Sequence, residues 1–107
     1  MTLTQELEAL SQQAERVVAK CTQGLYTDLV KASPVDTGNF RSAWTLTPIN
    51  KLTWEIRNPV DYASILWEGR RQVGDTYYGS AQWPGGGDPM LAQANRKLQA
   101  DLDSIRV

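Results

Sequence analysis

The sequence contains no histidine and a single cysteine, Cys21. Each of these two facts excludes a class of catalytic, metal-binding or disulfide chemistry. Without histidine there is no Ser-His-Asp or Cys-His triad, no histidine general acid or base, and no histidine-containing zinc site. One cysteine cannot close an internal disulfide, which argues against a small secreted scaffold held by disulfides. We expect neither a catalytic residue nor a cofactor, and the composition agrees with a protein that acts through shape and contact.

An excess of charge of one sign and a long apolar run are also missing. Eleven Lys and Arg against twelve Asp and Glu give a formal net charge of −1, so the composition does not indicate a nucleic-acid-binding protein. No apolar run approaches the ~20 residues of a membrane-spanning helix, and we expect no membrane contact. The first residues lack the basic and apolar regions of a signal peptide. We therefore expect the protein in the cytoplasm, or in a particle assembled there.

The first third of the chain predicts one long amphipathic helix. Apolar residues recur every three or four positions from Leu7 to Leu29, which predicts a helix from residue 3 to about residue 31. Thr2 and Gln5 have the spacing of a capping box, and Pro34 ends the helix. At 107 residues the chain has the size of one domain, so we expect a single domain over residues 1–107.

Shorter elements are predicted after Pro34. Two strands around residues 44–48 and 54–57 form a hairpin, and a short helix over residues 61–68 is ended by Gly69. Residues 70–87 are predicted to be a long loop or a two-stranded ribbon centred on Gly74-Asp75. The resulting fold class is α+β, with a long N-terminal helix, a small antiparallel or mixed sheet, a short helix, the loop or ribbon, and a C-terminal helix.

The boundaries of two helices are expected to depend on acidic caps. Asp36 is predicted to cap a short helical turn over residues 37–42. Asp88 is predicted to be the N-cap of the last helix, with Pro89 at its first position.

The four tryptophans all lie between Trp44 and Trp83. Trp44, Trp54 and Trp67 are predicted to form the core between the sheet and the helices. Trp83, which is followed by a proline and three glycines, is predicted to be exposed as an anchor for another subunit. Exposed tyrosine, tryptophan and arginine are the usual anchors of protein interfaces. The predicted interface therefore consists of Arg70, Arg71, Tyr77, Tyr78 and Trp83.

Other interpretations of these segments stay open. Arginine interleaved with aromatic residues is typical of single-stranded nucleic-acid binding, although acidic residues in the same segment leave no basic stripe. The acidic residues are numerous enough for a metal-dependent hydrolase, but no run resembles an EF-hand. The glycines at 85–87 precede a helix, where backbone N–H groups can bind phosphate, but the lysine and hydroxyl residue of a P-loop do not follow. A flexible hinge is the simpler interpretation of these glycines.

Three sequence elements occur in a fixed order. Pro34 to Gly38 reads Pro-Val-Asp-Thr-Gly and is followed by Phe40 and Arg41, Tyr62-Ala63 is followed by Glu68-Gly69, and a proline leads the last helix. This ordered set, from about residue 30 to residue 100, resembles the head–tail connector family of long-tailed bacteriophages, which comprises neck, tail-completion and tail-terminator proteins. The residues that carry the resemblance are Pro34, Asp36, Thr37, Gly38, Arg41, Tyr62, Glu68, Gly69, Asp88 and Pro89.

The resemblance implies a structural virion protein that is not an enzyme. Family members form a ring at the head-proximal end of the tail, where they terminate the tail tube or join it to the capsid neck. The implied partners are further copies of the chain, in a ring for which the tail side would demand six copies, together with tail-tube and neck proteins. DNA would pass through the ring lumen without specific recognition. The implied location is the tail or neck of the virion, after assembly in the host cytoplasm.

Overall fold

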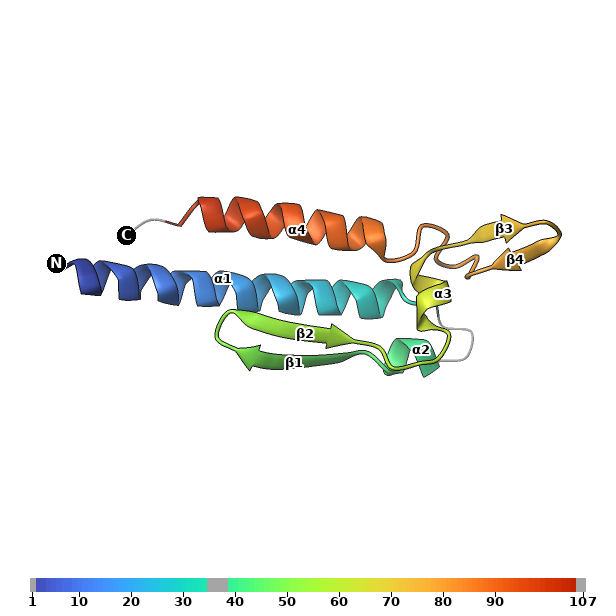
Figure 1. The fold of residues 1–107 in the computed structure, drawn as a ribbon, viewed down its shortest axis with the longest axis horizontal. Coiled ribbons are helices and arrows are strands. Elements are labelled where there is room, and N and C mark those ends of the chain that lie inside the picture. The colour runs from blue at the N-terminus through green and yellow to red at the C-terminus, as the bar shows by residue number, and fades with distance from the viewer. Residues whose placement is uncertain (1, 35–38, 106–107) are drawn as a thin grey trace.

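A computed structural model describes residues 2–34 and 39–105 and shows an elongated molecule (Figure 1). It extends 65 × 22 × 18 Å, and its radius of gyration is 17.6 Å. A compact chain of this length would have a radius of about 13 Å. In chain order the elements are α1 (Leu3–Ala32), α2 (Asn39–Ser42), β1 (Thr45–Asn50), β2 (Thr53–Arg57), α3 (Ala63–Trp67), β3 (Arg71–Val73), β4 (Thr76–Tyr78) and α4 (Asp88–Asp103).

Helix α1 is the frame on which the other elements are assembled. The predicted helix and its capping box are confirmed, since the Thr2 hydroxyl accepts a hydrogen bond from the Gln5 backbone N–H and Gln5 Oε1 accepts one from the Thr2 backbone N–H. At the other end, Arg41 donates from Nε to the carbonyl of Val30 at 2.7 Å and from Nη2 to that of Lys31 at 3.0 Å. These bonds satisfy carbonyls that the last turn of a helix leaves without a partner.

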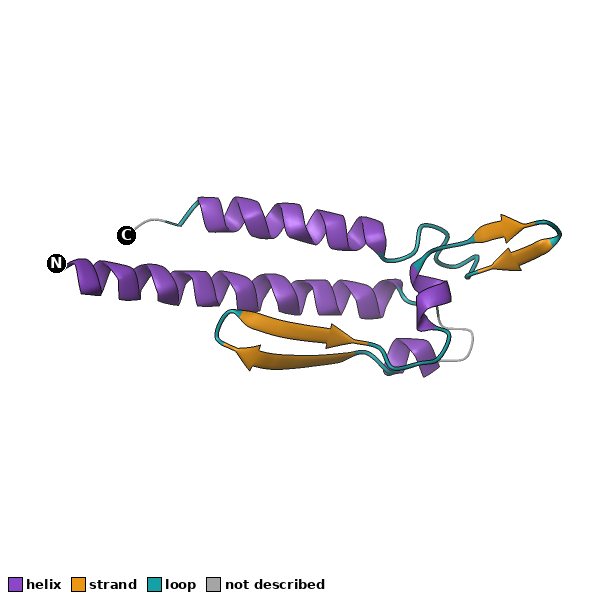
Figure 2. Ribbon diagram, in the orientation of Figure 1, coloured by secondary structure: helices purple, strands orange, loops and turns teal. Residues whose placement is uncertain are grey.

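The β1–β2 hairpin and α4 pack on α1 (Figure 2). The predicted hairpin is confirmed, with Leu46 opposite Ile56 and Pro48 opposite Trp54. This register puts the apolar side chains on one face, because successive residues of a strand point to opposite faces. Of the two alternatives predicted for residues 70–87, a long loop or a ribbon, the structure contains the ribbon, as β3 and β4 pair around the Gly74-Asp75 turn. The structure therefore has the α+β class that the sequence predicts.

The predicted role of Asp88 as N-cap is wrong. Gly87 is the N-cap of α4 and Asp88 is its first residue, so that its side chain is free to turn toward α3. There the Asp88 carboxylate accepts a hydrogen bond of 2.6 Å from the Trp67 indole N–H. The predicted cap Asp36 lies outside the described residues, as do Thr37 and Gly38.

An aromatic cluster forms the centre of the molecule. Phe40 is 2% exposed, and its ring centroid lies 5.4 Å from that of Trp44 and 5.9 Å from that of Trp83. Trp67 lies 6.1 Å from Trp83 with its ring perpendicular to it, the edge-to-face geometry that aromatic pairs favour. The Trp44 indole N–H donates to the hydroxyl of Ser33 at 2.7 Å, which pairs the polar edge of a buried ring.

The prediction that Trp83 is exposed is wrong, because this side chain is 7% exposed and belongs to the core. The prediction that Trp44 is a core residue is confirmed, whereas Trp54 and Trp67 are half-buried. Trp83 is buried because the chain turns back after the ribbon and the Trp83 ring packs against those of Phe40 and Trp67.

The glycines around Trp83 allow backbones to approach closely, and the interpretation as a flexible hinge is wrong. Gly86 has a φ of +65°, and a Cβ there would overlap the Trp67 carbonyl, while one on Gly87 would overlap the Trp67 ring. The Gly87 N–H donates to the Trp67 carbonyl and the Arg70 N–H to that of Pro84, both at 2.9 Å. Glycine permits this packing, because a Cβ would collide with the Trp67 backbone at Gly86 and with the Trp67 ring at Gly87.

Candidate functional site

The β3–β4 ribbon extends beyond the end of the body next to α3 (Figure 1). Its exposed side chains are large, with Val73 61%, Tyr77 58% and Tyr78 38% exposed. The Arg70 guanidinium lies 4.7 Å from the centroid of the Tyr77 ring, and that of Arg71 lies 5.5 Å from that of Tyr78. Exposed cation–π pairs of this kind contribute about 0.5–1 kcal/mol each. The ribbon therefore presents two ordered Arg–Tyr pairs to its surroundings.

Four of the five residues predicted as the interface lie together on or beside this ribbon, and Trp83 is the exception. Arg71 also forms an ion pair of 2.9 Å with Glu68, at the end of α3. Both side chains are about half exposed, so the pair contributes little to stability.

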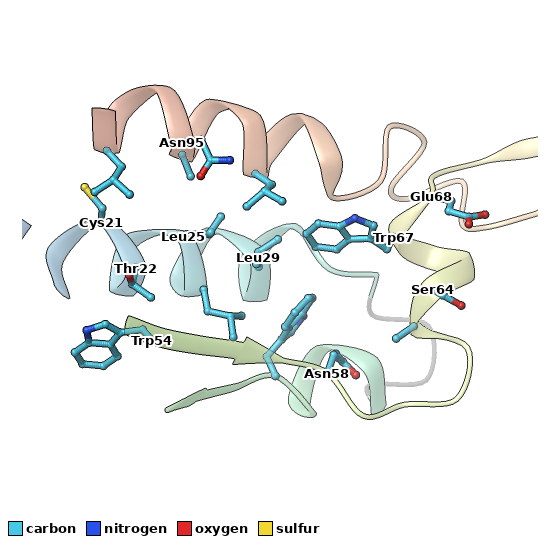
Figure 3. Close-up of a pocket in the computed structure, with 16 residues that line it drawn as sticks. Cys21, Thr22, Leu25, Leu29, Trp54, Asn58, Ser64, Trp67, Glu68 and Asn95 are labelled. Carbon is cyan, nitrogen blue, oxygen red and sulfur yellow. The ribbon is translucent and has the colours of Figure 1, made fainter. Parts of the chain in front are cut away.

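A groove of about 600 Å³ lies between α1, α4, β2 and α3 (Figure 3). Leu25 and Leu29 line it from α1, and Trp54 and Ile56 from β2, while Trp67 closes the end near α3. The groove reaches the surface, since several of its lining residues are exposed. Those exposed residues are Ser64, Glu68, Leu91 and Asn95.

Glu68 is the one charged residue among the sixteen that line this groove in the described part of the chain. The groove was not predicted from the sequence. The structure shows its origin in α4, whose apolar stripe contains no buried residue although the helix packs along α1. A stripe of that kind indicates a helix that covers its neighbour only in part.

Cys21 lies at the edge of the groove, and its thiol donates to a carboxylate oxygen of Asp101 at 3.4 Å. Burial raises the pKa of the Cys21 thiol, and the hydrogen bond and negative charge of Asp101 raise it further, against the opposing charges of Lys97 and Lys20. A thiol with a raised pKa is a weak nucleophile at neutral pH, because the thiolate is the reactive form.

The described motif residues lie where one element meets the next. Arg41 holds the end of α1, Tyr62 places its ring 6.5 Å from that of Phe40, and Gly69 turns the chain after α3 with a φ of +85°. The others described are Pro34 after α1, Glu68 in its ion pair with the ribbon, and Asp88 and Pro89 at the start of α4. Apart from the exposed ion pair of Glu68, these residues therefore act at the junctions between elements of the fold.

Two further properties concern the described residues. Within 2–34 and 39–105, no three His, Cys, Asp or Glu side chains are grouped so that they could hold a metal ion. None of the helices in these ranges combines the length and the apolar character that crossing a membrane requires.

Comparison with known proteins gives one family match. Residues 2–69 match the model of the HK97-gp10_like family, described as "Bacteriophage HK97-gp10, putative tail-component". The matched range is more than half of the chain, contains the first two sequence elements, and ends where the ribbon begins. No curated protein and no solved structure matches the chain.

Proposed function

The chain belongs to the HK97-gp10-like family of bacteriophage tail components, and from this premise we propose that it closes the head-proximal end of a phage tail. Copies of the chain form a ring, of six copies on the tail side, that terminates the tail tube or joins it to the capsid neck. Its partners are tail-tube and neck proteins, and DNA passes through the lumen without specific recognition. The role is structural rather than catalytic, and the ring assembles in the host cytoplasm.

The observation that carries the proposal is the imbalance between buried and exposed apolar side chains. Among the described residues, four hydrophobic side chains are buried and nine large ones are exposed. Exposed apolar side chains that are grouped together mark interaction sites in soluble proteins, and three of the nine, Val73, Tyr77 and Tyr78, lie together on the ribbon. The exposed set is Leu3, Leu7, Ile49, Leu52, Ile65, Val73, Tyr77, Tyr78 and Leu91.

The ribbon is the proposed contact element, and the whole chain acts as one domain that carries it. Arg70, Arg71, Tyr77 and Tyr78 remain the interface residues, and Trp83 is withdrawn from that set because it is buried. Binding of single-stranded nucleic acid is less well supported. Arg70 and Arg71 already lie over the rings of Tyr77 and Tyr78, where a base would have to stack.

Electron microscopy of tails made with and without the chain tests the proposal. In a phage or prophage that lacks the gene, we expect tails of uncontrolled length, or tails that do not join heads, and complementation should restore normal particles. Gold labelling of a tagged chain should mark the head-proximal end of the tail. Normal, joined particles in the absence of the chain would overturn the proposal.

A matched pair of variants tests the ribbon itself. Tyr77→Ala should fold, because the side chain that it removes is 58% exposed. It should nevertheless fail to complement, because that side chain belongs to the proposed contact. Ile49→Ala removes one that is 57% exposed at the tip of the β1–β2 hairpin, and should complement normally. Circular dichroism verifies the fold of both, and equal complementation would exclude the ribbon from the interface.

A further inference from the structure

The β3–β4 ribbon joins the body through three glycines whose backbones lie close together. Gly69 precedes β3, Gly79 follows β4 and Gly86 precedes α4, and their φ angles are +85°, +82° and +65°. We propose that these three residues, the glycine junction, hold the ribbon in one direction relative to the body and thereby position its interface side chains. This inference rests on the proposed contact role of the ribbon and identifies the residues that position it.

The close approach in the junction involves backbone atoms on both sides. A Cβ at Gly79 would lie 2.8 Å from the carbonyl carbon of Gly69, and one at Gly69 would lie 2.6 Å from the carbonyl oxygen of Pro84. A Cβ at Gly86 would lie 2.5 Å from the backbone nitrogen of Gly69 and would also overlap the Trp67 carbonyl. Backbone atoms cannot turn away as the end of a flexible side chain can. A side chain at any of the three positions therefore requires the chain itself to shift.

Hydrogen bonds tie the junction to the core. The Arg70 N–H donates to the Pro84 carbonyl, which links the start of the ribbon to the segment that leads into α4. The Gly87 N–H donates to the Trp67 carbonyl, which links that segment to α3. Gly69, between the two bonds, is buried. A swing of the whole ribbon would have to separate these paired groups, and leaving buried backbone groups without partners is unfavourable.

The glycine at the far end of the ribbon has a different role. Gly74 has a φ of +60° in the turn between β3 and β4, and a Cβ there would have nothing within 4 Å. The turn favours glycine for its backbone conformation, but no neighbouring segment blocks a side chain. Gly74 therefore separates the cost of a positive φ from the cost of a blocked close approach.

A fixed ribbon direction suits a contact that is repeated between copies. Arg70 and Arg71 lie over the rings of Tyr77 and Tyr78, so the side chains of the ribbon are ordered with respect to one another. Because the junction orders the ribbon as a whole, each copy presents these pairs at the same place relative to its body. A ring closes only when every copy repeats the same rotation. An element that is ordered before binding also loses less conformational entropy on contact.

Pulsed electron paramagnetic resonance on the free chain measures the direction of the ribbon. In a Cys21→Ser background, nitroxide labels are attached at Gln23→Cys on α1 and Thr76→Cys on β4, both at exposed positions. Gly79→Asn tests the junction, and Gly74→Asn is the matched control. Asparagine is chosen because it tolerates a positive φ better than most residues with a side chain. Far-UV circular dichroism verifies the fold of both variants.

We expect one narrow distance distribution for the intact junction and for Gly74→Asn, and a shifted or broadened distribution for Gly79→Asn. A broad distribution for the intact junction would overturn the inference, and this measurement decides the matter even if Gly79→Asn does not fold. An unchanged narrow distribution for a folded Gly79→Asn would overturn it as well.

Complementation separates this inference from the proposed function. In a phage that lacks the gene, Gly79→Asn should restore fewer normal particles than Gly74→Asn. Equal complementation, with the ribbon displaced in Gly79→Asn, would overturn the positioning role and leave the proposed ring intact. Normal particles in the absence of the chain would overturn the proposed function, whereas the distances in the free chain would still decide whether the junction fixes the ribbon.

Discussion

Replacing Trp83 by alanine tests whether the chain that follows the ribbon is part of the core. The side chain is 7% exposed and lies against Phe40 and Trp67. At about 25 cal/mol per Å² and 150–250 Å² for a buried aromatic ring, its burial corresponds to roughly 4–6 kcal/mol. Large-to-small changes of buried tryptophan cost about 3–5 kcal/mol, which is the loss we expect.

Trp54→Ala is the matched control, because Trp54 is half-buried and faces the groove. About half of the loss expected at Trp83, roughly 1.5–2.5 kcal/mol, should be seen there. Urea unfolding of both variants and of the unaltered chain, followed by far-UV circular dichroism, measures the free energy of unfolding without depending on tryptophan fluorescence.

A difference between the two variants is the decisive result. A loss for Trp83→Ala within about 0.5 kcal/mol, as for ordinary surface substitutions, would refute the reasoning. An equal loss for Trp83→Ala and Trp54→Ala would refute it as well, since the two side chains differ in burial.

Two further predictions concern glycine and cysteine. Gly87→Ala should destabilise the protein, because a Cβ there overlaps the Trp67 ring. Gly24→Ala should raise the free energy of unfolding by about 0.5–1 kcal/mol, because Gly24 lies in a helix with open space around it. Thermal melting compares the two variants, and equal shifts in melting temperature would contradict the close packing at Gly87. The pKa of Cys21 is raised by burial and by Asp101, so alkylation at neutral pH should be slower in the folded chain than in urea, and Asp101→Asn should accelerate it. The pKa of the thiol is higher in the folded chain than in the unfolded chain. The thiol's contribution to stability is therefore complete below its ordinary pKa and is lost as the pH rises through the raised pKa of the folded state. Measuring the free energy of unfolding at several alkaline pH values would detect this loss.

Local patterns in the sequence determined most of the secondary structure. The three-to-four-residue spacing in α1 and the Thr2–Gln5 pair predicted that helix with its cap, because both depend on residues within one or two turns. The turn at Gly74-Asp75 likewise indicated the ribbon as one of two alternatives, since the residues that form a hairpin are adjacent in the chain. The ordered motifs carried the family resemblance in the same way.

Only the tertiary structure decided where Trp83 and Asp88 lie. Glycines beside a tryptophan are as compatible with an exposed loop as with close packing, and the choice depended on Phe40 and Trp67. Asp88 has the sequence context of an N-cap, but the Trp67 indole offers its carboxylate a different partner. The groove also arises only once α4 and β2 lie across α1. Helices, turns and caps follow from interactions between near neighbours in sequence, whereas burial and grooves follow from contacts between segments that only the fold brings together.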